Sequence, residues 1–205
     1  ALAKRQPGSA FKPFVYAQAF LEGYAPETVV FDVETQFSTT CAVSDTTSEN
    51  GCYSPQNYDL KYRGPVSLRN ALAQSINVPA VKALYLVSIE DALRLARSLG
   101  IGTLVDSARY GLTLVLGGGE VTLLDMVSAY SVFANEGVRN APRSIMRIED
   151  RNGEKIREYP ATQNRVLEAN IALTVSDVLS DNTARTPAFG ANSPLQFSGY
   201  HVAAK

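Results

Sequence analysis

The sequence predicts an α+β fold that is rich in helix. Apolar residues recur at helical spacing in several segments, and short β-branched runs and one hairpin signal lie between them. No internal repeat or low-complexity tract interrupts this pattern. The 205 residues, 45% of them hydrophobic and 19% charged, are enough for one large core or two small ones.

The charge and the rare residue types narrow the function. The net charge is −1, and no run of lysine or arginine marks a nucleic-acid or anionic-membrane surface. With one histidine and two cysteines, the chain offers too few ligands for a zinc or iron site. We therefore expect no metal and no cofactor. No apolar run reaches the length of a membrane span, and no signal peptide opens the chain.

The first half of the chain predicts four helices and one strand. A helix is expected over residues 10–22, before Gly23 and Pro26, and a strand over residues 28–33. Ser67 is a good N-cap for a helix that runs to residue 74. After a turn at residues 75–77, helices are expected over residues 80–87 and 88–100.

The second half opens with a glycine-rich stretch at residues 102–120. A helix is expected over residues 122–137, and Arg151-Asn152-Gly153 predicts a hairpin between strands at residues 143–150 and 154–159. Residues 166–181 have helical spacing. A polar stretch follows, and residues 200–205 are expected to form a strand.

Residues 36–58 are rich in Ser, Thr, Asn, Asp and Gly, and they predict a long surface loop, an insertion between regular elements. The loop contains Cys41 and Cys52. A disulfide between them would constrain such a loop, and two unrelated free thiols are the alternative.

Ser9 and Lys12 form the first chemical motif. Residues three apart lie on one face of a helix, so this hydroxyl and this amine can meet. Pro13 requires the helix to begin nearby, where the positive end of its dipole favours developing negative charge. A lysine with a lowered pKa can activate a serine. A chain of this length contains Ser-x-x-Lys roughly once by chance, so the motif needs partners.

The partners follow in order along the chain: Ser75-Ile76-Asn77 in a turn between helices, and Lys205 at the last position. Ser48-Glu49-Asn50 also has the Ser-x-Asn spacing, but no helix is expected to hold it. The set resembles the transpeptidase domain of class A, bifunctional penicillin-binding proteins, within the penicillin-binding protein and serine β-lactamase superfamily. The resemblance covers almost the whole chain, through residues 5–13, 64–72, 75–81, 116–125 and 133–137.

The resemblance implies a reaction. Its members cross-link peptidoglycan through a serine that attacks a stem peptide ending in D-Ala-D-Ala, and β-lactams imitate that dipeptide. By this likeness Ser9 is the nucleophile and Lys12 its base. Ser75 relays a proton to the leaving nitrogen, Asn77 holds the substrate amide and Lys12, and Lys205 helps bind the substrate carboxylate.

The resemblance also implies that residues 1–205 are a partial transpeptidase domain. The family centres on an antiparallel sheet, most of which this chain should lack, and no Thr-Gly follows Lys205. We therefore expect the chain alone to be inactive, with the remaining strands lying elsewhere in the molecule; class A members also carry a glycosyltransferase domain. The family works outside the cytoplasmic membrane, held there by a segment outside this chain, and this location favours the disulfide between Cys41 and Cys52.

Three other functions fit the same sequence less well. A β-lactamase or D,D-carboxypeptidase would need a base for hydrolysis, and Glu136 with Asn140 has a Glu-x-x-x-Asn spacing that imitates one. A non-enzymatic penicillin sensor would use Ser9 only to bind drug. A Ser-His-Asp hydrolase would need His201 as its base, and the motif expected around its serine is missing near Ser9.

Overall fold

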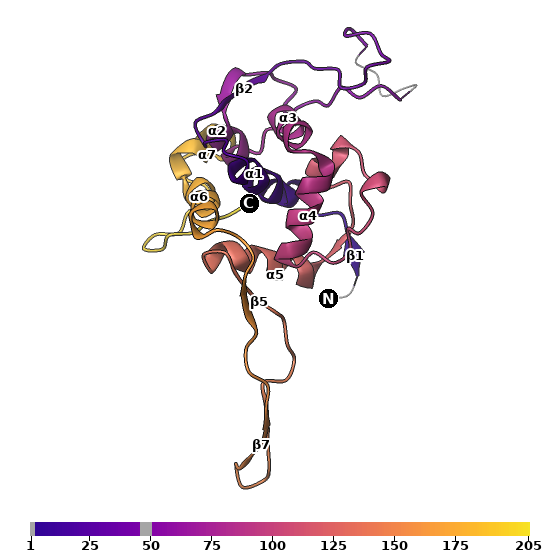
Figure 1. Cartoon of the computed structure of the whole chain (residues 1–205). Helices are drawn as coiled ribbons and strands as arrows, with labels where there is room; N and C mark the ends of the chain where they lie inside the picture. Colours follow the sequence, from indigo (N-terminus) through magenta and orange to yellow (C-terminus); the bar gives the residue numbers. More distant parts are fainter. Residues whose placement is uncertain (1–2, 46–50) are drawn as a thin grey trace.

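The computed structural model describes residues 3–45 and 51–205, and Ser48-Glu49-Asn50 lies outside them. Figure 1 shows a helical body with α1 at its centre and a long hairpin that projects from one end. In the described residues, no helix has both the length and the apolar character needed to cross a membrane.

The first half holds the helices that surround α1. A 3₁₀ turn, η1 (Gly8–Phe11), leads directly into α1 (Lys12–Leu21). The elements that follow are β2 (Val29–Asp32), β3 (Gly64–Ser67), α2 (Leu68–Ala73), α3 (Asn77–Val87) and α4 (Ile89–Leu99). Ser67 caps α2 as predicted, because its side chain accepts a hydrogen bond from Asn70 N.

In the described residues, the second half adds three α-helices and the hairpin. It contains the 3₁₀ turns η3 (Ser107–Arg109) and η4 (Leu112–Leu116), then β4 (Val121–Thr122), α5 (Leu123–Ala134), β5 (Val138–Asn140), β6 (Arg147–Glu149), β7 (Lys155–Glu158), β8 (Gln163–Arg165), α6 (Ala169–Ser180) and α7 (Asn182–Phe189). The predicted hairpin is confirmed: β6 and β7 pair antiparallel.

The strands form four two-stranded antiparallel sheets within the described residues. The short strand β1 (Lys4–Arg5) pairs with β4, and β2 pairs with β3. The pairs β5–β8 and β6–β7 complete the set. The fold is helix-rich, and a large central sheet is missing from the described part of the chain, as expected for part of a transpeptidase domain.

The hydrophobic core is built on α1. Its apolar residues point in every direction, and Phe14 and Tyr16 are fully buried, as is Phe11 directly before the helix. Helices α2, α3, α4 and α6 all contact α1 (Figure 1). The centroid of the Phe14 ring lies 5.5 Å from that of Tyr130 and 5.6 Å from that of Phe133. These ring contacts hold α1 against α5. Because neighbouring helices pack around α1, the residues at its first turn are held in fixed positions.

One prediction at the C-terminal end was wrong, and one helix there was not predicted. Residues 200–205 form no strand, because no neighbouring strand is available in the described residues; the backbone bonds there through Ala204 N to Leu179 O, 3.0 Å. The polar stretch after residue 181 is α7, a helix with Pro187 inside it. Asp181 starts this helix by accepting from Ala184 N at 2.8 Å.

In its described parts, residues 36–45 and 51–58, the loop of residues 36–58 consists of turns, bends and irregular backbone, with 3₁₀ geometry at Gly51. A disulfide joins Cys41 to Cys52. Phe37 N donates to Tyr53 O at 2.9 Å, and the Gln36 side chain accepts from Tyr53 N at 2.8 Å. These contacts close the base of the loop four residues before Asn57.

Candidate active site

Ser9 lies in the 3₁₀ turn directly before α1, close to where the sequence placed it. Gly8 has φ +58°, a conformation that favours glycine, and Pro13 occupies the first turn of α1. Tyr130 OH donates to Ala10 O at 2.8 Å and ties this turn to α5. In the described residues, no hydrogen bond holds the Ser9 hydroxyl.

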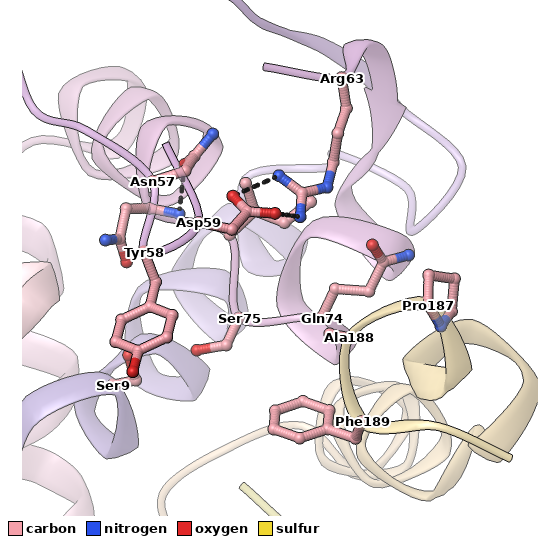
Figure 2. Close-up of a pocket in the computed structure, with 12 residues that line it drawn as sticks. Ser9, Asn57, Tyr58, Asp59, Arg63, Gln74, Ser75, Pro187, Ala188 and Phe189 are labelled. Carbon is pink, nitrogen blue, oxygen red and sulfur yellow. Dashed lines mark hydrogen bonds and ion pairs between the residues drawn. The ribbon is translucent and has the colours of Figure 1, made fainter. Parts of the chain in front are cut away.

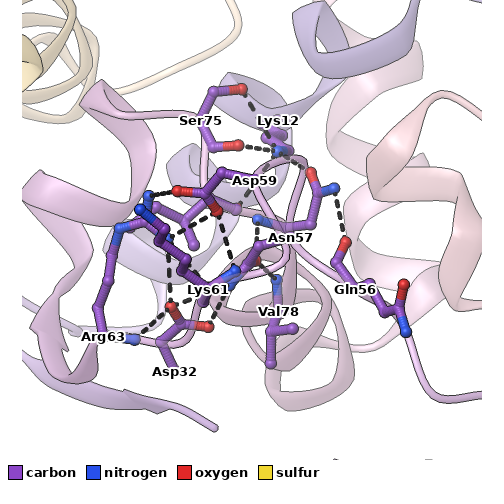
Figure 3. Close-up of polar contacts among 11 residues, drawn as sticks. Lys12, Asp32, Gln56, Asn57, Asp59, Lys61, Arg63, Ser75 and Val78 are labelled. Atoms are coloured by element: carbon purple, nitrogen blue, oxygen red, sulfur yellow. Dashed lines mark hydrogen bonds and ion pairs between the residues drawn. The ribbon is translucent and has the colours of Figure 1, made fainter. Parts of the chain in front are cut away.

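Lys12 is the first residue of α1, and its side chain is fully buried. Its Nζ donates to Ser75 O at 2.7 Å and to Asn77 Oδ1 at 2.8 Å. Ile76 O lies at 3.3 Å and Ser75 Oγ at 3.4 Å. The structure therefore brings together Lys12, Ser75 and Asn77, as the order of motifs predicted (Figure 3).

The surroundings favour a neutral amine at Lys12. Burial, with a contribution from the charge of Lys205, lowers the pKa of Lys12 from 10.5 to about 6. A neutral amine has two N–H groups, and the two short contacts, to Ser75 O and Asn77 Oδ1, can take both. Its lone pair is then left to accept a proton from a hydroxyl.

The turn between α2 and α3 presents Ser75 and Asn77 to Lys12. Ser75 has φ +62°, an uncommon conformation for a residue other than glycine. The backbone N–H of Ser75 donates to Leu72 O at 3.1 Å, and that of Ile76 donates to Ala71 O at 3.0 Å. The turn is therefore closed onto the end of α2, and α3 starts afresh at Asn77.

A cavity of about 440 Å³ opens over this cluster. Figure 2 shows the hydroxyl of Ser75 pointing toward the side where Ser9 lies, with Tyr58 and Phe189 on different sides of the cavity. It is lined by Ser9, Asn57, Tyr58, Asp59, Arg63, Gln74, Ser75, Ile76, Asn77, Pro187, Ala188 and Phe189. The nucleophile predicted from the sequence thus shares one concave site with the Ser-x-Asn turn.

Lys205 is placed behind this cavity rather than among the residues that line it. Its Nζ donates to Leu72 O at 2.7 Å, one turn before Ser75. Burial, and then the charge of Arg185, lowers the pKa of Lys205 from 10.5 to about 7. Its positive charge is one cause of the lowered pKa of Lys12.

The residues of the alternative functions lie elsewhere. Glu136 is exposed in the turn after α5, with φ +50°, and its carbonyl accepts from the Arg165 side chain at 2.7 Å. His201 is exposed in the C-terminal segment. Neither lines the cavity that holds Ser9. The structure therefore offers no carboxylate base at position 136 and no imidazole base at position 201 for this site.

Sequence reasoning missed the polar residues behind and around the cavity. Asn57, at the end of the cysteine loop, is 3% exposed, and Asp32 in β2 is fully buried. Asp32 could have been noticed, because it shares the buried face of β2 with Val30 and a buried carboxylate needs partners. Nothing in the polar loop distinguishes Asn57 or Tyr58 from their neighbours.

Comparison with known proteins identifies the family of this chain. Residues 2–205 match the family model described as the penicillin binding protein transpeptidase domain. Penicillin-binding protein 1A of Aquifex aeolicus is 41% identical over 159 residues, covering 76% of this chain and 20% of that protein. Penicillin-binding protein 2D of Bacillus subtilis is 32% identical over 179 residues, covering 87% of this chain and 24% of that protein. The chain thus spans about a fifth to a quarter of the length of these relatives.

Solved structures show the same fold. The crystal structure of penicillin-binding protein 1A from Haemophilus influenzae covers 97% of this chain, with a TM-score of 0.76 at 23% identity, and the match spans 32% of that chain. An imipenem acyl-enzyme complex of penicillin-binding protein A from M. tuberculosis covers 98% of this chain, with a TM-score of 0.77 at 18% identity, and the match spans 48% of that chain. With its relatives among the class A proteins, this chain belongs to the family of penicillin-binding protein transpeptidase domains.

Proposed function

We propose that this chain carries the acylation centre of a peptidoglycan D,D-transpeptidase in which Ser9 is the nucleophile. The observation that carries the proposal is the buried amine of Lys12, held by Ser75 O and Asn77 Oδ1 behind the cavity that Ser9 lines. With a lysine as its base, a serine nucleophile needs a neutral amine nearby, and burial supplies such an amine at Lys12, three residues after Ser9.

In the first half of the reaction, Ser9 Oγ attacks the carbonyl carbon of the penultimate D-alanine. Its proton passes to the neutral amine of Lys12 as the Oγ–C bond forms. The positive end of α1 favours the negative charge that develops on the substrate oxygen. The tetrahedral intermediate then loses the terminal D-alanine, whose nitrogen takes up a proton through Ser75.

In the second half, an amine of a neighbouring stem peptide attacks the ester at Ser9. As the new amide bond forms, the incoming amine gives a proton to the Lys12 and Ser75 pair, and that proton passes to Ser9 as the Ser9 Oγ–C bond breaks. Asn77 would bind the substrate amide while it holds Lys12, and Lys205 would support the substrate carboxylate through its charge. A β-lactam would acylate Ser9 by the same first half and remain attached.

The proposal also concerns the rest of the protein. Residues 1–205 would be part of a transpeptidase domain, with residues 36–58 as a surface insertion closed by the Cys41–Cys52 disulfide. The remaining strands of the domain, and a glycosyltransferase domain, would lie in other parts of the molecule. The cross-linking reaction places the protein outside the cytoplasmic membrane, where stem peptides are found.

The test uses the full-length gene product. Fluorescent penicillin should label it covalently, with Ser9→Ala abolishing the label and mass spectrometry locating the adduct on the peptide that contains Ser9. A stem-peptide thioester analogue should transfer its acyl group to a D-amino acid acceptor. Labelling without transfer would refute a transpeptidase and support a penicillin sensor. Rapid release of the acyl group to water, lost in Glu136→Gln, would support a β-lactamase.

A further inference from the structure

Asn57 lines the inner wall of the cavity, and its side chain connects three segments that are distant in sequence. Its side-chain Nδ2 donates to Asp32 Oδ1 at 2.8 Å, to Asp32 Oδ2 at 3.0 Å and to Lys61 O at 2.8 Å. Its Oδ1 accepts from the backbone N–H groups of Asn77 at 3.0 Å and Val78 at 3.1 Å. All of the bonding capacity of this buried amide is thus used (Figure 3).

The orientation of the Asn57 amide is fixed by Asp32. This carboxylate is fully buried, accepts from Arg63 N at 3.0 Å, and lies 3.7 Å from the Arg63 guanidinium. A carboxylate can only accept hydrogen bonds, so it selects the Nδ2 side of Asn57. The carbonyl oxygen must then face the start of α3, where no side chain of the helix itself provides a cap.

The same short segment also holds the side chain of Asn77. Gln56 O accepts from Asn77 Nδ2 at 3.0 Å, which leaves Asn77 Oδ1 to accept from Lys12 at 2.8 Å. Residues 56 and 57 therefore bind Asn77 at two points, its backbone N–H and its side-chain amide. The hydrogen bond from the Lys12 amine to Asn77 Oδ1 depends on these two contacts.

We propose that Asn57, oriented by Asp32, is a positioning residue for acylation: it holds the start of α3 so that Asn77 keeps the Lys12 amine directed at the serines. The inference rests on the function proposed for Ser9 and Lys12. Asn57 acts through Asn77 and Lys12 and takes no part in bond making. It also excludes water from the buried face of the turn, which Asp32 and Val78 line.

The electrostatics of Lys12 supply a readout for this role. Among the described residues, the charge that faces Lys12 is that of Lys205 in the C-terminal segment, Arg185 of α7 faces Lys205, and Asp32 of β2 reaches Lys12 only through Asn57 and Asn77. Burial is the main reason that the amine is neutral near pH 7. Loosening the turn would admit water, and the protonated amine would then persist to higher pH.

The experiment measures the second-order rate constant of acylation by fluorescent penicillin from pH 5 to pH 10, in the full-length gene product. Each rate is divided by the amount of protein that labels at saturation, so that a smaller folded fraction does not count as a slower reaction. Asn57→Ala should lower the rate near neutral pH about tenfold to 10²-fold, as expected for a misplaced reacting group. The acid limb of its profile should move to higher pH.

Two further variants and one control complete the test. Asn57→Asp faces Asp32 with a second carboxylate, and Asp32→Asn faces the Asn57 amide with another amide, so each should be slow. Combined, they exchange the two groups and restore the pair between positions 32 and 57, while the bond to Lys61 O stays lost. The double variant should therefore acylate faster than either single variant but more slowly than the wild type. Asn152→Ala, in the exposed turn of the β6–β7 hairpin, should behave as the wild type.

The outcomes separate this inference from the function beneath it. A wild-type protein that never labels at Ser9 overturns both. A wild type that labels, with an Asn57→Ala profile of unchanged shape and height, overturns the positioning role alone. If Asn57→Ala does not fold, the comparison of the double variant with its two single variants decides: a double variant that is not faster than both single variants refutes the role.

Discussion

A Cβ atom placed on Gly117 would lie 2.2 Å from the backbone nitrogen of Gly8 and 2.4 Å from its Cα. Both distances are far below van der Waals contact, so the glycine-rich stretch after η4 packs directly on the turn that carries Ser9. Gly117 also has φ +96°, which disfavours other residues. The two glycines, 109 positions apart in the sequence, set how closely this loop packs on the turn of Ser9.

Gly117→Ala is therefore expected to displace the turn of Gly8 and Ser9. Acylation by fluorescent penicillin, measured per folded protein, should fall on the order of 10²-fold, because the nucleophile moves relative to Lys12. Gly153→Ala is the matched control. Gly153 has a similar φ of +84°, but nothing lies within 4 Å of a new Cβ. Its substitution therefore introduces backbone strain without a steric clash. Equal effects of the two substitutions would contradict the packing explanation.

Lys12→Met should remove the base while it keeps a long side chain in the buried site. General-base catalysis contributes roughly 10² to 10⁴-fold, and acylation should fall by about that amount. In the wild type, acylation should decline as the pH falls through about 6, where the Lys12 amine becomes protonated. A wild-type rate that is flat from pH 5 to pH 8 would contradict Lys12 as the base.

The same lysine makes stability depend on pH. Its folded-state pKa of about 6 lies below the unfolded value of 10.5, so the unfolded chain binds more protons between these values. The free energy of unfolding should therefore rise as the pH rises from about 6 to 10.5. Lys205, with a folded-state pKa of about 7, acts in the same direction. In urea titrations at several pH values, Lys12→Met should reduce the rise of the free energy of unfolding with pH. A smaller rise should remain, because Lys205 still titrates.

Tyr130→Phe tests the link between α5 and the Ser9 turn. The substitution removes the hydrogen bond from Tyr130 OH to Ala10 O and should cost about 1 kcal/mol of stability. Acylation should slow, since Ala10 is next to the nucleophile. Tyr200→Phe, at an exposed tyrosine, is the control and should change neither quantity. The check is a denaturant midpoint together with a labelling rate.

The Cys41–Cys52 disulfide closes a short loop, and its loss should destabilise the protein by roughly 3 kcal/mol or less. In the variant with both cysteines changed to serine, the melting temperature should fall while the acylation rate per folded protein changes little. The reason is that Asp32 and Lys61 hold Asn57 independently of the disulfide. A loss of acylation at unchanged stability would contradict this separation.

The sequence was sufficient for features with a local physical cause. The helical spacing, the N-cap at Ser67 and the turn signal at Arg151-Asn152-Gly153 act within a few residues, and the corresponding elements are present. The convergence of Ser9, Lys12 and the 75–77 turn could be anticipated only because the motifs occur in the family order. Spacing along the chain alone does not determine where Ser75 meets Lys12.

The remaining features depend on contacts between distant segments. Asn57 lies in a polar loop, and its importance comes from Asp32 on one side and the start of α3 on the other. The close approach of Gly117 to Gly8 is equally invisible in either segment alone. Helix α7 was missed because Pro187 favours a loop assignment, whereas the Asp181 cap stabilises the helix around it.

Ser75 holds a hydroxyl at a left-handed backbone position, where glycine would relax the chain and where an ordinary residue costs about 1–2 kcal/mol. Directed evolution for heat resistance alone should thus favour glycine at position 75. The variants selected in this way would melt at a higher temperature but would lack the hydroxyl proposed as the proton relay. Screening should therefore reward turnover together with thermal tolerance.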